Sequence, residues 1–305
     1  MWIVTGASGF VGGHVLTELE GTMSARGLHR RELRAWDREN LSAALAGATG
    51  VVHAASVVHK PTTPAAEYTR FNVDGTRALL EAARDAGVRR FVFVSSIKVY
   101  GESPGAVIDE HTPIAAEAHY ARTKAEAEAL VLAATDLHPV VLRLCPVYGR
   151  GDKGNIRTVI RAIARRRFFV PGDGSTRKSI VHVSTVARVI RAAAASERTG
   201  AFVVADRHAP SMRELADTLA RLLGRRRPVS IPTPLLRTAA SVLGRAARAA
   251  HINTAISGEL IDKAMTSSVC DPSRVERELG VTCEVDQDWA LADEIAWLRE
   301  SGDLR

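Results

Sequence analysis

The sequence predicts an α/β protein built on a doubly wound parallel sheet, with a smaller and mostly helical region towards its C-terminal end. Three features of the 305-residue chain predict this fold. A short apolar run, Trp2 to Val4, leads directly into a glycine-spaced turn and then into a helical pattern. Further apolar runs, each too short for a helix, alternate with helical stretches up to residue 144, as buried parallel strands and crossover helices do. Beyond Tyr148 this alternation gives way to mostly helical segments.

The turn after the first apolar run has the glycines of a dinucleotide-binding loop. Gly6 allows a tight turn, Gly9 lets a pyrophosphate approach the backbone, and Gly12 lets helix and strand pack closely. A helix is expected from Phe10 to Leu19, and its N-terminus offers free N–H groups to phosphate. Strand, turn and helix together predict a Rossmann-type site with cofactor contacts from Gly6, Ser8, Gly9, Phe10, Val11 and Gly12.

The expected second strand, Met23 to Leu28, leads into a basic segment. An acidic residue about 20 positions beyond the glycines suits the free ribose of NAD, whereas a basic residue there suits the 2′-phosphate of NADP. This window holds Arg26 and Arg30 and reaches its first acid only at Glu32. We therefore expect NADP(H) to be favoured, with Arg26 or Arg30 facing the phosphate, while NAD(H) stays open. The alternative is that both arginines are ordinary exposed residues.

The next elements bring small side chains to the ligand edge of the sheet. Residues 34–37 are expected to form a third strand and residues 41–45 a short helix. The following apolar run ends in Ala54 and Ala55, and small side chains at the carboxyl end of a parallel strand leave room for a cofactor. We place His53, Ala54 and Ala55 among the cofactor contacts, although a histidine inside a strand also fits a satisfied core residue.

A serine stands at the end of a further expected strand. A helix through residues 71–87 leads into the apolar run 91–94, which ends in Ser95 and Ser96. Because the carboxyl ends of parallel strands meet at one edge, we expect Ser96 to lie near the glycine turn. Residues 139–144 are the last strand of the alternation, and the resulting six strands predict a parallel sheet.

The expected helix 119–134 carries a tyrosine and a lysine one turn apart. Tyr120 and Lys124 stand at i and i+4, hence on one face of the helix. A tyrosine is a poor base at neutral pH because its usual pKa is about 10. The cationic Lys124 is expected to lower that pKa, as would an oxidised nicotinamide, so that Tyr120 becomes a proton carrier. Ser96 is expected to hydrogen-bond the same substrate oxygen.

The C-terminal part is expected to complete the sheet and to add the smaller subdomain. Residues 201–205 read as one more strand, and the chain is mostly helical from Ser211 onward, with Trp289 and Trp297 expected in the core. We assign residues 1–147 and 179–205 to a dinucleotide-binding domain. We assign residues 148–178 and 206–305 to a substrate-binding subdomain.

The net charge of +7 comes from arginine in short clusters such as 30–31, 165–167 and 225–227. Clusters this short are expected to be solvated surface, and nothing about them indicates a nucleic-acid platform. A basic protein suits anionic small molecules such as a nucleotide. Residues 235–250 place arginines on one face of an expected helix, which we take as an exposed helix, with a helix lying on a membrane surface as the alternative.

Composition excludes several other classes. No stretch of 18 uncharged apolar residues occurs, so we expect no membrane insertion and a soluble cytoplasmic protein. The apolar content of 46% fits a globular protein. The three cysteines, Cys145, Cys270 and Cys283, have no metal-type spacing and are expected to be buried structural thiols. No metal site is therefore expected.

These motifs together resemble one superfamily. The loop from Thr5 to Gly12, Ser96, and Tyr120 with Lys124 are similar to the extended short-chain dehydrogenase/reductases, in particular to the NAD-dependent epimerase/dehydratase group. The similarity covers nearly the whole chain and extends to His53-Ala54-Ala55, Asn72, Gly75-Thr76, Ser95 to Gly101, and Tyr148-Gly149.

The resemblance implies an oxidoreductase that acts at C4 of a nucleotide-activated sugar, as bacterial UDP-sugar 4-epimerases and 4-ketoreductases do. It also implies that Lys124 holds the nicotinamide ribose and that the enzyme is a homodimer. Ile97 and Lys98 stand where the sugar dehydratases carry an Asp-Glu pair, which disfavours dehydration. The substrate contacts that the resemblance implies are Ser96, Asn155, Arg177 and Lys178.

Two other functions stay open. The same scaffold serves reductases and dehydrogenases of small carbonyl or sterol-like substrates, which an apolar pocket without phosphate contacts from Arg177 and Lys178 would favour. A redox-silent NADP sensor is the third reading. Ser96, Tyr120 and Lys124 speak against it, because a pure binding module does not need them.

Overall fold

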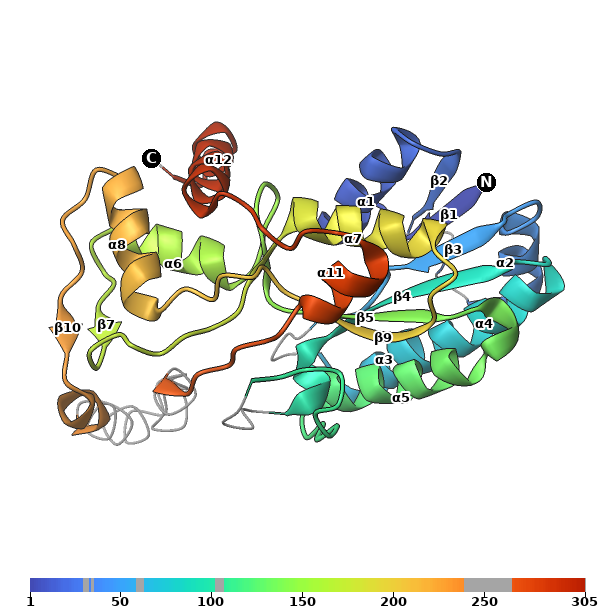
Figure 1. Cartoon of the computed structure of the whole chain (residues 1–305), viewed down its shortest axis with the longest axis horizontal. Helices are drawn as coiled ribbons and strands as arrows, with labels where there is room; N and C mark the ends of the chain where they lie inside the picture. The colour runs from blue at the N-terminus through green and yellow to red at the C-terminus, as the bar shows by residue number, and fades with distance from the viewer. Residues whose placement is uncertain (30–32, 34–35, 59–62, 102–106, 239–264, 305) are drawn as a thin grey trace.

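The computed structural model describes the chain except for residues 30–32, 34–35, 59–62, 102–106, 239–264 and 305. Arg30 and most of the segment 235–250 therefore lie outside the described residues. Figure 1 shows two lobes side by side, a sheet covered by helices on both faces and a smaller, mostly helical lobe. The described residues contain no helix that is both long enough and apolar enough to cross a membrane.

The large lobe contains a parallel six-stranded sheet with the strand order β2-β1-β3-β4-β5-β9. Neighbouring residues within a strand pack into opposite layers: Ile3 lies in one core cluster and Val4 in the other. Both clusters are fully covered by helices, which is why these strands read as continuous apolar runs. The strands are β1 (Trp2–Thr5), β2 (Ala25–Leu28), β3 (Gly50–His53), β4 (Arg90–Ser96), β5 (Val140–Leu144) and β9 (Gly200–Val204).

Helices cover both faces of this sheet, as Figure 1 shows. The helices α1 (Phe10–Glu20) and α7 (Val183–Ala195) pack together over one face and bury apolar stripes that include Val15, Leu19 and Ile190. The other face is covered by α2 (Arg38–Ala44), α4 (Gly75–Asp85) and α5 (His119–Ala133). The predicted doubly wound architecture is thus confirmed.

The strand order places a crevice at the carboxyl ends of β1 and β3. The chain moves from β1 to β2 on one side and later to β3 on the other side, with Thr5 paired in register with His53. Ligands of open α/β sheets bind where the strand order reverses in this way. The glycine turn follows Thr5 and the two alanines follow His53, so both sequence motifs meet at this crevice.

The smaller lobe has its own apolar core. It is formed by α6 (Asn155–Ala164), α8 (Met212–Leu222) and α12 (Gln287–Glu300), together with the short parallel strands β7 (Val170–Pro171) and β10 (Ser230–Ile231). A capping box stabilises the start of α8, because Ser211 and Glu214 each accept a hydrogen bond from the backbone N–H of the other.

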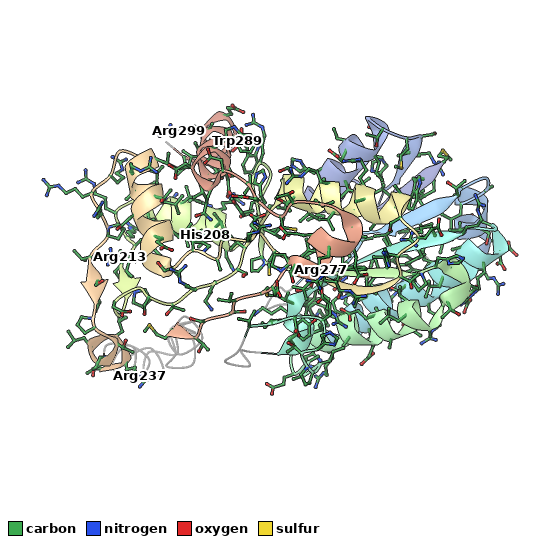
Figure 2. The ribbon with its side chains drawn as sticks, in the orientation of Figure 1. His208, Arg213, Arg237, Arg277, Trp289 and Arg299 are labelled. Carbon is green, nitrogen blue, oxygen red and sulfur yellow. The ribbon has the colours of Figure 1, made fainter. Side chains whose placement is uncertain are left out.

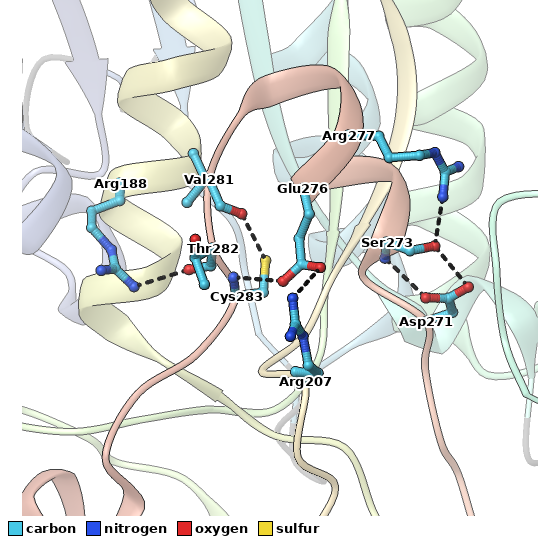
Figure 3. Close-up of polar contacts among 9 residues, drawn as sticks. All are labelled: Arg188, Arg207, Asp271, Ser273, Glu276, Arg277, Val281, Thr282 and Cys283. Carbon is cyan, nitrogen blue, oxygen red and sulfur yellow. Dashed lines mark hydrogen bonds and ion pairs between the residues drawn. The ribbon is translucent and has the colours of Figure 1, made fainter.

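One segment of the C-terminal region returns to the sheet. In Figure 3, α11 (Ser273–Leu279) is anchored by Glu276, which accepts hydrogen bonds from Arg207 and from the backbone N–H of Cys283. Val275 and Cys283 are buried in the core cluster that lies beneath α7. The stretch from Cys270 to Cys283 thus packs with the large lobe, although the predicted division assigns it to the smaller subdomain.

Two expectations about individual segments are wrong. No strand includes Trp36 and Asp37: Asp37 is the N-cap of α2, and Trp36 adopts a left-handed backbone with φ of 46°. The sixth strand of the sheet is instead β9, which corresponds to the further strand predicted at residues 201–205. Trp289 is 56% exposed on the surface of α12 rather than in the core (Figure 2), whereas Trp297 is partly buried against it.

Candidate functional site

The glycine loop has the geometry of a phosphate cradle. Gly6 has a φ of 71°, and a Cβ there would lie 2.8 Å from the backbone nitrogen of Ala55. A Cβ on Gly12 would lie 2.2 Å from the Gly6 carbonyl oxygen, so only glycine lets α1 start this close to β1. The two glycines therefore bring the loop, the strand β3 end and the helix into contact, as the sequence predicted.

The first turn of α1 offers its backbone N–H groups to a ligand. Gly9 is the N-cap, and no side chain caps this helix end. The first turn contains no acidic residue. Free N–H groups and the positive end of the helix dipole at this point suit a pyrophosphate. Gly9 and Ser8 are exposed at the mouth of the loop, and Phe10 and Val11 are half-buried behind them.

A cleft of about 270 Å³ opens beside the glycine loop. It lies at the crevice between the ends of β1 and β3, where the strand order predicts a ligand. Three of the predicted contacts on the loop and both alanines line it, and sequence reasoning missed its aromatic and loop residues. The lining comprises Gly6, Ser8, Gly9, Leu33, Trp36, Ala54, Ala55, Ser56, Val57, Val58, Thr63, Glu67 and Phe71.

Trp36 forms one wall of this cleft. Its ring lies over Gly75, where a Cβ would come within 2.4 Å of the indole, and it makes edge contacts with His53 and Phe71. The indole Nε1 is buried and has no hydrogen-bond partner among the described residues. A flat aromatic wall suits the adenine end of a dinucleotide. In the sequence, the only local sign of this aromatic wall is a tryptophan just before a helix start. That position does not reveal which residues the ring contacts.

His53 is a satisfied core residue. The imidazole is fully buried, with Nδ1 2.7 Å from Thr5 Oγ1 and Nε2 3.1 Å from Thr76 Oγ1. Burial lowers the pKa of His53 to about 3, and the charge of Lys124 lowers it further. Both ring nitrogens are engaged inside the sheet, so the structure corrects the placement of the His53 side chain among the cofactor contacts.

Arg26 points away from the glycine loop. Its guanidinium donates a hydrogen bond of 2.7 Å to the carbonyl of Ala44 at the end of α2. The next residue, Gly27, faces the loop instead, because a Cβ there would meet Ala7 at 2.6 Å. The expected contact between Arg26 and a 2′-phosphate is therefore wrong. Among the described residues, the basic side chain on the side of the glycine loop is His29. Its Cε1 lies 4.0 Å from the position that a Cβ on Gly27 would take.

The serine and tyrosine predicted to act together are adjacent in the structure. Ser96 ends β4, and Tyr120 stands in the first turn of α5. Their side chains are close enough for the Ser96 hydroxyl to lower the pKa of Tyr120. Ser96 also accepts a hydrogen bond of 3.2 Å from the backbone N–H of Lys98 as the N-cap of a short 3-10 helix, η2 (Ile97–Tyr100). Both residues are half-buried.

Lys124 lies one turn further along α5 and is almost completely buried. Its Nζ donates to the carbonyl oxygen of Val94 at 2.7 Å and lies 4.4 Å from the centre of the Phe93 ring. Burial lowers the pKa of Lys124 to about 7, while the nearby carboxylate of Glu128 raises it. The lysine is thus held against β4, behind the tyrosine.

The expected lowering of the Tyr120 pKa is wrong for this structure. Burial raises the pKa of Tyr120 to about 12, the hydrogen bond from Ser96 lowers it, and Tyr68 raises it. Lys124 is not among these causes, and its ammonium is committed to the Val94 carbonyl instead. In this state the Tyr120 hydroxyl is protonated at neutral pH, and its proton is available for donation.

Asn72 connects the cleft to the helix that carries Tyr120. It lies in a π-helical turn, η1 (Thr69–Asp74), which follows α3 (Ala65–Tyr68). Its Oδ1 accepts a hydrogen bond of 2.9 Å from the N–H of Val57, and its Nδ2 donates to Thr123 Oγ1 at 3.1 Å. A buried amide that bonds both segments fixes the distance between them, and π-helical turns often occur at functional sites.

A buried ion pair lies behind Lys124. Arg143 on β5 donates two hydrogen bonds, of 3.0 Å and 2.8 Å, to Glu128 Oε2 and a third, of 2.7 Å, to Tyr100 Oη. The other carboxylate oxygen, Glu128 Oε1, is buried without a partner among the described residues. Glu128 stands one turn after Lys124 on α5, so this pair supports the back of the site.

The expected substrate contacts do not converge in one cluster. Asn155 is exposed at the first position of α6. Arg177 donates to the carbonyl of Ala209 at 2.8 Å and pairs with Glu214 at 3.4 Å, so its guanidinium is engaged at the start of α8. Lys178 is half-buried, and its backbone forms a bridge with Ser268. Roles for these three residues stay predictions.

No group of three or more His, Cys, Asp or Glu residues that could hold a metal ion occurs in the described part of the chain. Cys145, Cys270 and Cys283 are all free and buried, which confirms the predicted burial of these thiols.

Comparison with known proteins gives a consistent result. A profile described as the NAD dependent epimerase/dehydratase family matches residues 2–205. The chain is 27% identical over 251 residues to N-acetyl-alpha-D-glucosaminyl-diphospho-ditrans,octacis-undecaprenol 4-epimerase of Escherichia coli O157:H7, which covers 76% of each protein. It is 29% identical to sterol demethylase protein B of Methylococcus capsulatus over 98% of each protein.

A solved structure covers almost the whole chain. It is described as MoeE5 in complex with UDP-glucose and NAD. The two chains are 28% identical, the match covers 98% of this chain and 99% of the other, and the TM-score is 0.78. Both lobes of the fold are therefore shared with a protein of known structure.

Proposed function

Because the chain belongs to the NAD-dependent epimerase/dehydratase family, we propose that it is an oxidoreductase acting at C4 of a nucleotide-activated sugar, as a 4-ketoreductase or a 4-epimerase. The observation that carries the proposal is the pair of Ser96 and Tyr120 with Lys124 one turn behind it. Asn72 connects the helix that carries Tyr120 to Val57 in the wall of the cleft. The UDP-glucose complex of the similar MoeE5 structure supports the substrate class.

Each of the three side chains has one role in this proposal. Ser96 donates a hydrogen bond to the C4 oxygen of the sugar and fixes the carbon in place. Tyr120 Oη gives its proton to that oxygen in reduction and takes it back in oxidation. Lys124 holds the cofactor ribose. A nicotinamide dinucleotide bound along the glycine loop supplies the hydride chemistry.

Replacing Tyr120 by phenylalanine tests the proposal. We expect kcat to fall about 10²- to 10⁴-fold, because this is the usual contribution of a positioned proton carrier. Cofactor affinity should change little, since the variant keeps the glycine loop. The first readout is the turnover of UDP- and dTDP-linked 4-keto sugars with added NADPH or NADH, measured by absorbance. The second readout is cofactor binding, measured by calorimetry.

Tyr68→Phe is the matched control, because the Tyr68 ring centroid lies 6.4 Å from that of Tyr120 and Tyr68 is buried. It removes a hydroxyl from the same surroundings and should keep most of the activity. Undiminished turnover by Tyr120→Phe would refute the assigned role.

For the cofactor, we propose a preference for NADP(H) within the nicotinamide class. The support is the absence of an acidic side chain from the described end of β2, where Leu28 is followed by His29 on the side of the glycine loop. An acidic residue is what an NAD site uses to bind the 2′-hydroxyl. Calorimetric titration with both cofactors checks this prediction, and a tenfold or greater preference for NAD would overturn it.

Reduction of a small carbonyl or sterol-like substrate is the second candidate. The observation in its favour is the full-length similarity to a sterol demethylation protein, together with the engagement of Arg177 by Ala209 and Glu214, which removes one expected phosphate contact. A substrate screen that contains both keto sugars linked to nucleotides and 3-ketosteroids separates the two candidates by the relative kcat/KM.

A further inference from the structure

Two arginine triplets that lie far apart in the sequence meet at the outer end of the small lobe. The parallel strands β7 and β10 pair Val170 with Ser230 and Pro171 with Ile231. Residues 165–167 and residues 225–227 precede the two strands at the same distance in the sequence, and each of these six positions is an arginine. We call these two triplets, with the Phe169 and Val229 that follow them, the arginine tip.

The contacts between the two segments confirm that the triplets are neighbours. The N–H of Val170 donates to the carbonyl oxygen of Val229 at 2.9 Å, and Arg225 donates to the carbonyl oxygen of Ala164 at 3.2 Å. Arg213 ties the second segment to α8 through a 2.8 Å hydrogen bond to the carbonyl oxygen of Pro228. Figure 1 draws β7 and β10 at the left edge of the molecule, away from the sheet, and Figure 2 shows Arg213 at the same end.

The charge of the tip is largely uncompensated by the protein. All six arginines are exposed. Arg227 lies 3.9 Å from Asp217, which also pairs with Arg213 at 3.3 Å. The other five arginines have no ion pair with a described residue. Arginine after a helix C-terminus is favourable for the helix dipole, and this accounts for Arg165 and Arg225 at the ends of α6 and α8. It does not account for the remaining four.

Apolar side chains stand exposed directly beside this charge. Phe169 is 42% exposed and Val229 is 70% exposed, and their backbones are adjacent across the strand pair. Leu235 is 62% exposed just beyond β10. A folded protein gains nothing from exposing these groups next to concentrated positive charge. An anionic bilayer can bind both the charged and the apolar side chains. Lipid phosphates bind the arginines, while the apolar side chains enter the boundary between headgroups and acyl chains.

We propose that the arginine tip docks the protein on the surface of a membrane that contains anionic phospholipid. The exposed phenylalanine and valine favour a lipid surface over a nucleic acid, which offers no apolar layer to them. The contact is peripheral and uses no spanning helix. It is independent of the proposed reaction, because no residue of the tip belongs to the glycine loop or to the Ser96, Tyr120 and Lys124 site.

Co-sedimentation of the full chain with vesicles tests the proposal. The protein should bind vesicles of phosphatidylcholine with phosphatidylglycerol, should not bind phosphatidylcholine alone, and should be released by rising salt. Replacing all three arginines of either triplet by glutamine should weaken binding about a hundredfold, since each arginine near an anionic surface contributes about fivefold. The double variant Phe169→Ser, Val229→Ser should weaken the part of vesicle binding that remains at high salt.

The matched control removes the same charge from the large lobe. Arg77, Arg89 and Arg198 are exposed there, and replacing all three by glutamine should leave vesicle binding unchanged. Thermal melts and turnover of a soluble substrate check that each tip variant is folded, and Tyr120→Phe should bind vesicles as the wild type does. Three results would each overturn the proposal. The protein fails to bind the anionic vesicles, the tip and control variants bind equally well, or the arginines are needed for binding to a duplex oligonucleotide while vesicles are not bound.

Discussion

Lys124 is held by one carbonyl and by the field of one carboxylate, and this makes its charge sensitive to small changes. Its Nζ bonds the carbonyl oxygen of Val94, and burial lowers its pKa to about 7. The negative charge of Glu128 opposes this effect and raises the pKa. A lysine poised near neutral pH loses its proton when the stabilising carboxylate is removed.

Replacing Glu128 by glutamine should therefore lower the pKa of Lys124. If the protonated lysine is the active form, the loss of kcat/KM at high pH should begin at lower pH in this variant than in the wild type. The variant also leaves Arg143 without its anion, which costs about 3–5 kcal/mol of stability for a buried pair. The pH profile of kcat/KM is the measurement, because a stability loss alone does not move it.

Tyr100→Phe is the control for this experiment. It removes the third hydrogen bond of Arg143 but leaves the charge of Glu128 in place. Its profile should coincide with that of the wild type. A profile of Glu128→Gln that also coincides would show that the carboxylate does not act on Lys124.

The elements of the sheet could be predicted because their signals are local. The runs that became β1, β3, β4 and β5 are continuous and apolar, since both faces of each strand are covered. Ser96 at a strand end and Tyr120 with Lys124 at helical spacing are local signals too. Their convergence followed from the rule that parallel strands end at one edge.

The segments that could not be predicted depend on distant partners. The sequence pattern predicts a strand at Trp36, yet the Trp36 ring packs over Gly75 and makes an edge contact with Phe71. Nothing near Trp36 in the sequence signals either residue. The strands β7 and β10 are two residues long, and the helices α6 and α8 that precede them pack together. The two arginine triplets therefore read as separate surface clusters until the fold brings them together.

The two lobes meet at a buried carboxyl group on α12. Glu294 is fully buried, and its Oε2 accepts a hydrogen bond of 3.0 Å from the N–H of Gly149, in the segment that leaves the large lobe. Its other oxygen, Oε1, has no partner among the described residues. Burial, followed by the charge of Asp152, raises the pKa of Glu294 to about 8. The junction thus holds a neutral carboxylic acid at neutral pH.

This carboxyl group should make the folded protein less stable as the pH rises. In the unfolded chain a glutamate titrates near 4.3, so between there and about 8 the folded state binds the extra proton and stability falls with pH. The penalty is complete above about pH 8 and is on the order of a few kcal/mol. Glu294→Gln keeps the shape without the charge and should remove the penalty. In thermal melting, the stability of the variant relative to the wild type should therefore increase from about pH 6.5 to about pH 8 and then level off.

Asp152, His182 and Asp206 are other buried groups at the junction whose pKa values are shifted, that of Asp152 upward by burial. Burial lowers the pKa of His182 to about 4 and raises that of Asp206 to about 6, so their opposing contributions end below the range in which Glu294 titrates in the folded state. Glu300→Gln, at an exposed position on the same helix, is the control and should run parallel to the wild type. If Glu294→Gln and Glu300→Gln give the same pH dependence, the junction does not hold a neutral acid, and the two lobes are joined by an ionised carboxylate that the structure leaves half-satisfied.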